Sequence, residues 1–164
     1  MIGASIIAEG EGSAEVRVAL AIREHWEVRM PATTAEEAHR LWADAFKGGD
    51  VDAVLELYEQ GAVFVAQPGA PLVRGKDAVR EVVRTFVAMG GTFNMDPTDS
   101  IECDGVAVLY SRWTLEGGSD ADGNAIELAG QTTDVVRRQS DGTWLFAIDN
   151  PWGVQAFAAP ADTA

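Results

Sequence analysis

Two aspartates in the last predicted hairpin, Asp134 and Asp149, are the residues whose type and position most strongly suggest chemistry. The hairpin covers residues 126–149, and residues 140–142 (Ser-Asp-Gly) form its turn. Side chains alternate between the two faces of a strand, so Asp134 shares a face with Thr132 and with small or apolar residues. A carboxylate in such surroundings must be paired, hydrogen-bonded or neutralised, and acid–base catalysis uses the same kind of environment.

Asp134 could also have a purely structural role. It could be paired with Arg112 on the neighbouring predicted strand, or hydrogen-bonded to Thr132 or Tyr110. A structural acid of this kind would only hold the sheet together. A catalytic acid would instead face a cavity that is open to solvent.

The return strand, residues 144–149, leaves open which of its faces is buried. Asp149 shares a face with Leu145 and Ala147, opposite a face that carries Phe146 and other large apolar side chains. The following Asn-Pro could also make Asp149 the start of a strand-ending turn. Asp149 is therefore predicted either to face a pocket or to end the strand.

Composition limits the classes of function. The chain has 164 residues, 47% of them hydrophobic, which fits one domain with a sizeable core. Its formal charge of −14 makes nucleic acid and anionic membranes poor partners. One cysteine, Cys103, and two histidines, His25 and His39, show no metal-ligand spacing. We expect a cytoplasmic protein, because the N-terminal sequence has neither a secretory signal nor a membrane-spanning run.

Helical patterns come first along the chain. Residues 1–32 are predicted to be an N-terminal extension. Within it, residues 13–30 alternate like a strand, but their composition favours a helix, which Pro31 ends. Thr34 and Glu37 read as a capping box that opens a helix ending at residues 48–49 (Gly-Gly). Asp50 caps a second helix that runs to about residue 59, and a third covers residues 76–89. On the first helix, His39 is expected on an exposed flank without a role.

Strands dominate the rest of the sequence. A strand is predicted at 62–67, a short one at 92–95 that 100–103 could continue beyond Pro97, and a long one at 106–115. The long strand places Leu109, Ser111 and Trp113 on one face, and the hairpin carrying Asp134 follows it. Helices followed by an antiparallel meander indicate an α+β fold, with a core domain at 33–153 and a tail at 154–164.

Several motifs resemble the ketosteroid isomerase-like, SnoaL-like (nuclear-transport-factor-2-like) superfamily. They are residues 42–52 (WADAFKGGDVD), 61–65 (GAVFV), 74–79 (RGKDAV) and 141–144 (DGTW). The resemblance covers about residues 33–152. It implies a cone-shaped curved mixed β-sheet wrapped around N-terminal helices, a cystatin-like α+β barrel with a ligand cavity and often a dimer. It also implies one of several activities, because isomerases, cyclases, dehydratases and non-catalytic binding domains share this fold.

Position by position, the resemblance is uneven. Ketosteroid isomerases have an oxyanion-binding tyrosine where this chain has Trp42, and a proton-shuttling aspartate where it has Ala66 or Gln67. An indole donates one hydrogen bond but transfers no proton at ordinary pH. The acid on the penultimate strand matches Asp134, which is similar to the aspartate that SnoaL-type cyclases use as their acid–base group.

The sequence therefore predicts a small-molecule-binding protein that carries out proton-transfer chemistry of the isomerase, cyclase or dehydratase type on an apolar cyclic or polyketide-like substrate. Asp134 and Asp149 are the predicted catalytic residues. Six further residues are predicted to contact the substrate, although aromatic residues at such spacings are also common in cores: Trp42, Tyr58, Gln67, Leu109, Ser111 and Trp113. No cofactor and no metal are expected. The alternative is a non-catalytic ligand-binding or dimerisation module.

A homodimer is the predicted assembly. The outer face of the sheet would expose Val106, Val108, Tyr110 and Val135, and a monomer would leave this apolar area in water.

Overall fold

The structure is a computed structural model that describes residues 31–157, and the predicted N-terminal helix therefore lies outside the described residues. Three α-helices, a six-stranded sheet and a short 3₁₀ helix make up this part of the chain. In chain order the elements are α2 (Ala35–Lys47), α3 (Val51–Glu56), β1 (Tyr58–Phe64), β2 (Val73–Arg74), α4 (Lys76–Ala88), β3 (Thr92–Cys103), β4 (Val106–Ser119), β5 (Ala125–Arg138), β6 (Trp144–Asp149) and η1 (Gly153–Phe157).

The helices begin where the capping residues predict. The hydroxyl of Thr34 accepts a hydrogen bond from the Glu37 backbone N–H at 3.3 Å, and the Glu37 carboxylate accepts from the backbone N–H of Thr33 at 2.8 Å. The capping box is thus closed through Thr33 rather than through the N-cap itself. Asp50 caps α3 by accepting from the Ala53 N–H at 2.9 Å.

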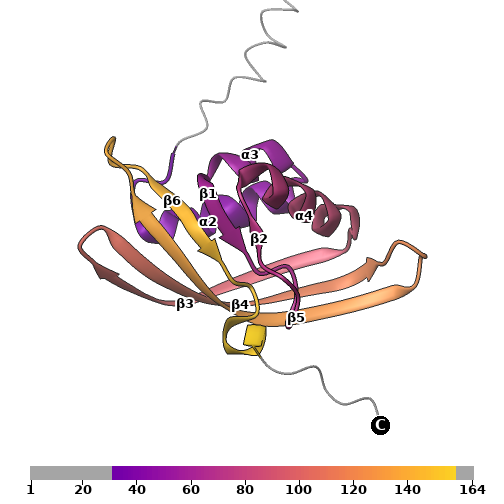
Figure 1. Cartoon of the computed structure of the whole chain (residues 1–164). Helices are drawn as coiled ribbons and strands as arrows, with labels where there is room; N and C mark the ends of the chain where they lie inside the picture. The colour runs from indigo at the N-terminus through magenta and orange to yellow at the C-terminus, as the bar shows by residue number, and fades with distance from the viewer. Residues whose placement is uncertain (1–30, 158–164) are drawn as a thin grey trace, which may run out of the picture. The chain divides into compact units, whose positions relative to one another are not determined.

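The sheet is mixed, with strand order β2-β1-β6-β5-β4-β3. Only β1 and β6 pair in parallel, and every other neighbouring pair is antiparallel. The long strands β4 and β5 bend at a register shift between Leu115 and Gly118. Figure 1 shows the three helices gathered on one side of this curved, unclosed sheet. The fold is therefore the predicted α+β cone, with its core between helices and sheet.

The second predicted helix is too long. It ends at Glu56, and Tyr58 starts β1, so the strand begins before the predicted Ala62. Tyr58 pairs with Phe146 of β6 in the parallel ladder and is 1% exposed. Its burial against the sheet, together with the preference of aromatic residues for strands, outweighs the helical spacing that the sequence shows.

Strand β3 passes through Pro97 without ending, as the predicted continuation at residues 100–103 requires. It is one of the two edge strands of the sheet, and its register shifts between Pro97 and Asp99. A proline has no N–H to donate, and an edge strand with a bulge tolerates that loss. None of the helices in the described part of the chain is both long and apolar enough to cross a membrane.

Candidate functional site

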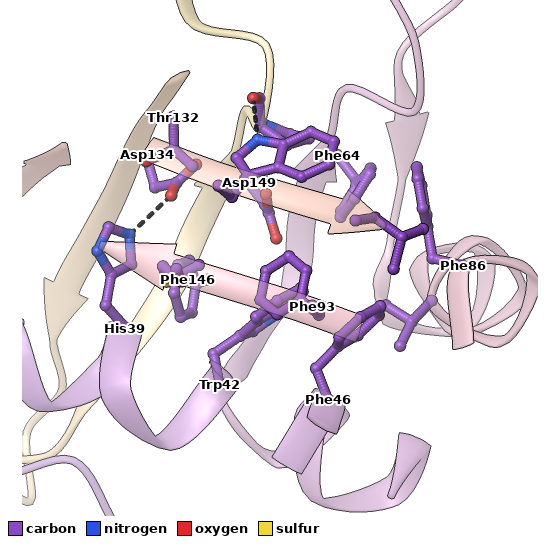
Figure 2. A pocket seen from close by; sticks show the side chains of 15 residues that line it. His39, Trp42, Phe46, Phe64, Phe86, Phe93, Thr132, Asp134, Phe146 and Asp149 are labelled. Atoms are coloured by element: carbon purple, nitrogen blue, oxygen red, sulfur yellow. Dashed lines mark hydrogen bonds and ion pairs between the residues drawn. The ribbon is translucent and has the colours of Figure 1, made fainter. Parts of the chain in front are cut away.

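A cavity lies between the helices and the inner face of the sheet. Most of its lining is apolar or aromatic, and the polar lining residues are His39, Thr132, Asp134 and Asp149. Figure 2 shows His39 and Asp134 at one end of the cavity and Phe46 and Phe86 at the other. The free space is about 40 Å³, room for roughly three water molecules. An apolar chamber with a few convergent polar groups is typical of a small-molecule site.

A bulge in β6 brings Asp149 into this cavity. Phe146 pairs with Val136 and Ile148 pairs with Val135, so Ala147 is an extra residue on β6 with no partner on β5. Because of the extra residue, Phe146 and Asp149 both line the cavity although simple alternation places them on opposite faces. The sequence left open which face of residues 144–149 is buried, and the bulge turns residues from both faces toward the cavity.

The Asp134 carboxylate is held by two protein groups. Its Oδ2 lies 2.7 Å from His39 Nε2, and its Oδ1 accepts the backbone N–H of Asn150 at 2.7 Å. His39 and Asp134 are each only 2% exposed, and the His39 ring also stacks on Phe146 with centroids 6.0 Å apart. The pair is a buried acid–imidazole contact whose position is fixed from α2, β5 and the end of β6.

The Asp149 carboxylate is held on one oxygen only. Trp42 Nε1 donates to the Tyr58 hydroxyl at 2.8 Å, and that hydroxyl donates to Asp149 Oδ2. Within the described residues, Asp149 Oδ1 has no hydrogen-bond partner. Figure 2 shows the carboxylate of Asp149 directed into the cavity. Asp149 thus presents one oxygen to a ligand, whereas the other is oriented by the Trp42–Tyr58 chain.

The electrostatic surroundings favour the neutral forms of Asp149 and Tyr58. Burial raises the pKa of Asp149 well above 3.8, the negative charge of Asp134 raises it further, and the Tyr58 hydrogen bond opposes the rise only in part. Burial also raises the pKa of Tyr58 well above 10.0, with Asp149 adding to the shift. Tyr58 therefore stays a hydrogen-bond donor at neutral pH.

The remaining predicted site residues fall into three groups. Trp42 and Trp113 line the cavity. Tyr58 stands behind Asp149, while Leu109 and Ser111 are buried outside the lining, with Ser111 Oγ 3.2 Å from Thr132 Oγ1. Gln67 is exposed in the loop that follows β1, which ends at Phe64, and it is not among the residues that line the cavity.

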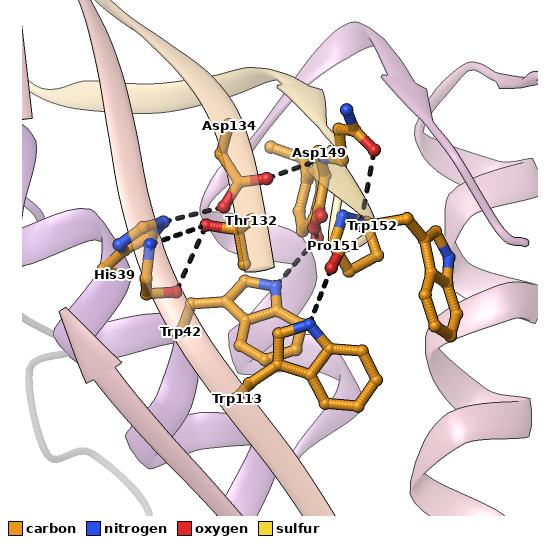
Figure 3. Close-up of polar contacts among 11 residues, drawn as sticks. His39, Trp42, Trp113, Thr132, Asp134, Asp149, Pro151 and Trp152 are labelled. Carbon is orange, nitrogen blue, oxygen red and sulfur yellow. Dashed lines mark hydrogen bonds and ion pairs between the residues drawn. The ribbon is translucent and has the colours of Figure 1, made fainter. Parts of the chain in front are cut away.

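The segment after β6 closes part of the cavity wall. Trp113 Nε1 donates to the backbone carbonyl of Pro151 at 2.7 Å, and the Trp152 ring meets Trp113 edge-on at 5.4 Å (Figure 3). A Cβ on Gly130 would lie 2.6 Å from that same Pro151 oxygen. Gly130 is therefore needed for this segment to approach β5 closely enough for Pro151 to line the cavity.

One alternative and one expectation about the neighbours of Asp134 are wrong. The alternative was a pair with Arg112, but Arg112 lies on the outer face of β4 and contacts Asp96 at 3.2 Å. His39 is not on an exposed flank, because the flank of α2 that carries it packs against the sheet. The spacing of His39, Trp42 and Phe46, at i, i+3 and i+7, is the signal that could have placed His39 on the buried face.

The chemistry available in the cavity comes from its carboxyl, imidazole and aromatic side chains. No group of three or more metal-ligating side chains occurs among residues 31–157. Asp149 supplies one acid, Asp134 supplies a second beside the imidazole of His39, and aromatic rings form much of the wall. Such groups can bind an apolar molecule and exchange protons with it.

A family model for the SnoaL-like domain matches residues 38–146. A ketosteroid isomerase-like protein from Erwinia carotovora atroseptica is 25% identical, with a TM-score of 0.62, and the match covers 70% of this chain and 88% of that chain. A proposed calcium/calmodulin-dependent protein kinase type II association domain from Thiobacillus denitrificans is 19% identical, with a TM-score of 0.62 and coverage of 76% and 98%.

A proposed dehydratase of the nuclear-transport-factor-2-like family from Streptomyces avermitilis is 17% identical, with a TM-score of 0.55 and coverage of 70% and 89%. Among the curated proteins, none matches this sequence. The solved structures share the curved sheet and helices described above, and the family model spans most of the described residues. The chain therefore belongs to the SnoaL-like domain family.

Proposed function

We propose that the protein is a cofactor-independent enzyme that moves protons on a small apolar, cyclic or polyketide-like molecule. One observation supports this most: two carboxyl groups from neighbouring strands line the same aromatic cavity in contrasting surroundings. Burial raises the pKa of Asp149, and Asp134 contacts an imidazole and a backbone N–H. Carboxyls whose environments differ in this way are suited to act as acid and base in one reaction.

In this proposal the acid proton of Asp149 has a definite position. Since Oδ2 accepts the Tyr58 hydroxyl, the acid proton belongs on Oδ1, the oxygen that faces the cavity. It is there available to a carbonyl or hydroxyl oxygen of the ligand. Tyr58 and Trp42 are positioning residues in this scheme, because they act through Asp149.

Asp134 is the base. Each carboxylate oxygen has two acceptor sites, so Asp134 can still accept a proton from the cavity while bound to His39 and Asn150. In an enolisation, Asp134 takes the proton next to a ligand carbonyl, the C–H electrons form the C=C bond, and the carbonyl oxygen takes the proton of Asp149. Return of a proton to another carbon completes an isomerisation, and both carboxyls recover their starting state.

A non-catalytic binding module remains the second candidate. In either case the free space is only about 40 Å³, so a cyclic ligand enters only if wall side chains move. Phe86 and Phe93 are half-buried and are the side chains best placed to do so. The similarity to a proposed kinase association domain shows that the same fold also occurs in a protein named for assembly.

Hydrogen–deuterium exchange into small ketones tests the proposal without knowledge of the natural substrate. The protein is incubated in D₂O with 1-indanone or 2-tetralone, and NMR measures deuterium next to the carbonyl. We expect exchange above the buffer rate, reduced about 10²- to 10⁴-fold in Asp134→Asn and in Asp149→Asn. Asp96→Asn, the same change at an exposed position, is the control.

Equal exchange in the wild type and both site variants would contradict the proposed catalysis. Binding of the ketones, seen as quenching of tryptophan fluorescence, without any exchange would support the binding module instead. Trp42 and Trp113 line the cavity, so a ketone bound there is expected to quench their fluorescence.

We further propose that the chain works in the cytoplasm as a homodimer paired through the outer face of the sheet. Val106 and Ile148 on that face are 38% and 40% exposed. Burying such apolar area favours association. Sedimentation of the full chain should give a mass above the 17.5 kDa of one chain at micromolar concentration, and a mass near that value would contradict the dimer.

A further inference from the structure

A groove on the surface continues the candidate cavity at its apolar end. Phe46, Phe86, Phe93 and Leu115 line both spaces. Figure 2 shows Phe46 and Phe86 at the end of the cavity away from His39 and Asp134. The cavity and the groove therefore adjoin at Leu115 and at the aromatic wall, defined as Phe46, Phe86 and Phe93.

The aromatic wall is packed but not sealed. The Phe46 and Phe93 rings meet edge-on with centroids 4.8 Å apart, and Phe93 meets Trp42 in the same way at 5.8 Å. Phe86 and Phe93 are half-buried, so each ring has one side that other side chains do not cover. A ligand that displaces these rings would occupy both spaces at once.

Within residues 31–157, the groove is lined by one basic and no acidic side chain, although the protein as a whole is acidic. The chain carries 26 acidic against 12 basic residues, yet no carboxylate side chain is among the described residues that line the groove. Lys47, the last residue of α2, is the one charged side chain among them, and it forms no ion pair with the described residues. Thr92 and Asn94 add a hydroxyl and an amide.

We propose that the groove is the outer half of the binding site and that the substrate is an apolar carboxylate. This inference rests on the proposed function. The reacting ring or ketone lies in the cavity beside Asp149, the apolar chain passes through the displaced aromatic wall, and the carboxylate binds the Lys47 ammonium. A neutral lipid-like molecule would form no ion pair with Lys47, and Lys47 would therefore not increase its affinity.

Lys47 is exposed, so its contribution is modest and sensitive to salt. We expect roughly a twofold to fivefold preference for an anionic over a matched neutral ligand at low ionic strength. The preference should decline as salt is added, because exposed charges are screened. A contribution of this size discriminates between ligands without determining whether the apolar part binds.

Matched ligand pairs measure the preference directly. The probes are 4-(2-naphthyl)butanoate and 6-(2-naphthyl)hexanoate with their primary amides, titrated by tryptophan fluorescence against the full chain. The wild type should prefer each carboxylate, Lys47→Met should abolish the preference, and Lys47→Glu should reverse it. Lys76→Met removes the other lysine, which lies at the start of α4 outside the groove, and should keep the wild-type preference.

A carboxylate preference that persists in Lys47→Met, or is absent from the wild type, would overturn the inference. A second variant tests the passage through the wall: Phe86→Ala should increase affinity for the hexanoate more than for the butanoate. Equal increases would contradict the continuous site.

Failure of this inference can be told from failure of the proposed function. The exchange assay uses neutral ketones, which do not require Lys47. If the wild type exchanges those ketones but binds naphthyl carboxylates and amides equally, only the substrate class is wrong. If neither ligand series binds and no exchange occurs, both proposals are wrong.

Discussion

Asp134 and Asp149 are the same residue type on adjacent strands, and both are buried, at 2% and 5% exposure. Their hydrogen-bond partners, however, differ. Asp134 has both oxygens bound, one by the imidazole of His39 and one by a backbone N–H. Asp149 has one oxygen bound by a tyrosine and the other directed into the cavity. The partners supplied by α2 and β1 therefore decide which carboxyl is fixed and which can exchange a proton.

Replacing Asp149 should produce the largest effect, through the pH dependence of stability. The folded pKa of Asp149 is raised above its unfolded value of 3.8, so the stability it contributes is complete below that value and is lost as pH rises through the folded pKa. Asparagine does not titrate. We expect Asp149→Asn to gain stability relative to the wild type by up to about 1.4 kcal/mol per pH unit from near pH 4 upward.

Urea unfolding of both proteins at several pH values measures this difference. The gain should level off once pH exceeds the folded pKa of Asp149. A stability difference that does not change with pH would show that the cavity does not hold Asp149 in its acid form.

Replacing Asp134 should have the next largest effect. A carboxylate gives one oxygen to His39 and one to the Asn150 N–H, whereas an amide has only one oxygen to share. Asp134→Asn should therefore leave a buried donor without an acceptor and cost about 1–3 kcal/mol at neutral pH. Unchanged stability in urea would contradict this expectation and would mean that the asparagine amide replaces both hydrogen bonds.

Removing the Tyr58 hydroxyl should have a smaller effect on stability but a specific effect on Asp149. Tyr58→Phe takes the acceptor from Trp42 Nε1 and the donor from Asp149, at a cost of about 1–2 kcal/mol. The Tyr58 hydrogen bond lowers the pKa of Asp149, so its loss should move the titration of that carboxyl to higher pH. Trp42→Phe, which removes only the donor to Tyr58, is the matched control and should move the titration less.

The sequence predicted the sheet better than the site. Alternation along residues 106–115 correctly placed Leu109, Ser111 and Trp113 on the buried face, because one face of a long strand packs on the core. The bulge at Ala147 was not predictable, since alternation alone cannot show an extra residue. His39 was missed because a histidine on a helix gives no sign of its partner, and Asp134 lies 95 positions away in the chain.

We propose that Asp149 carries a proton at neutral pH, because burial and the charge of Asp134 both raise its pKa. Infrared difference spectroscopy of the full chain distinguishes the C=O stretch of a carboxylic acid from the bands of a carboxylate. We predict an acid band at pH 7 that disappears in Asp149→Asn and persists in Asp134→Asn. The band in Asp134→Asn should titrate at lower pH, because the charge that raises the pKa of Asp149 is gone. Absence of the band in the wild type, or its loss in Asp134→Asn but not in Asp149→Asn, would contradict the account.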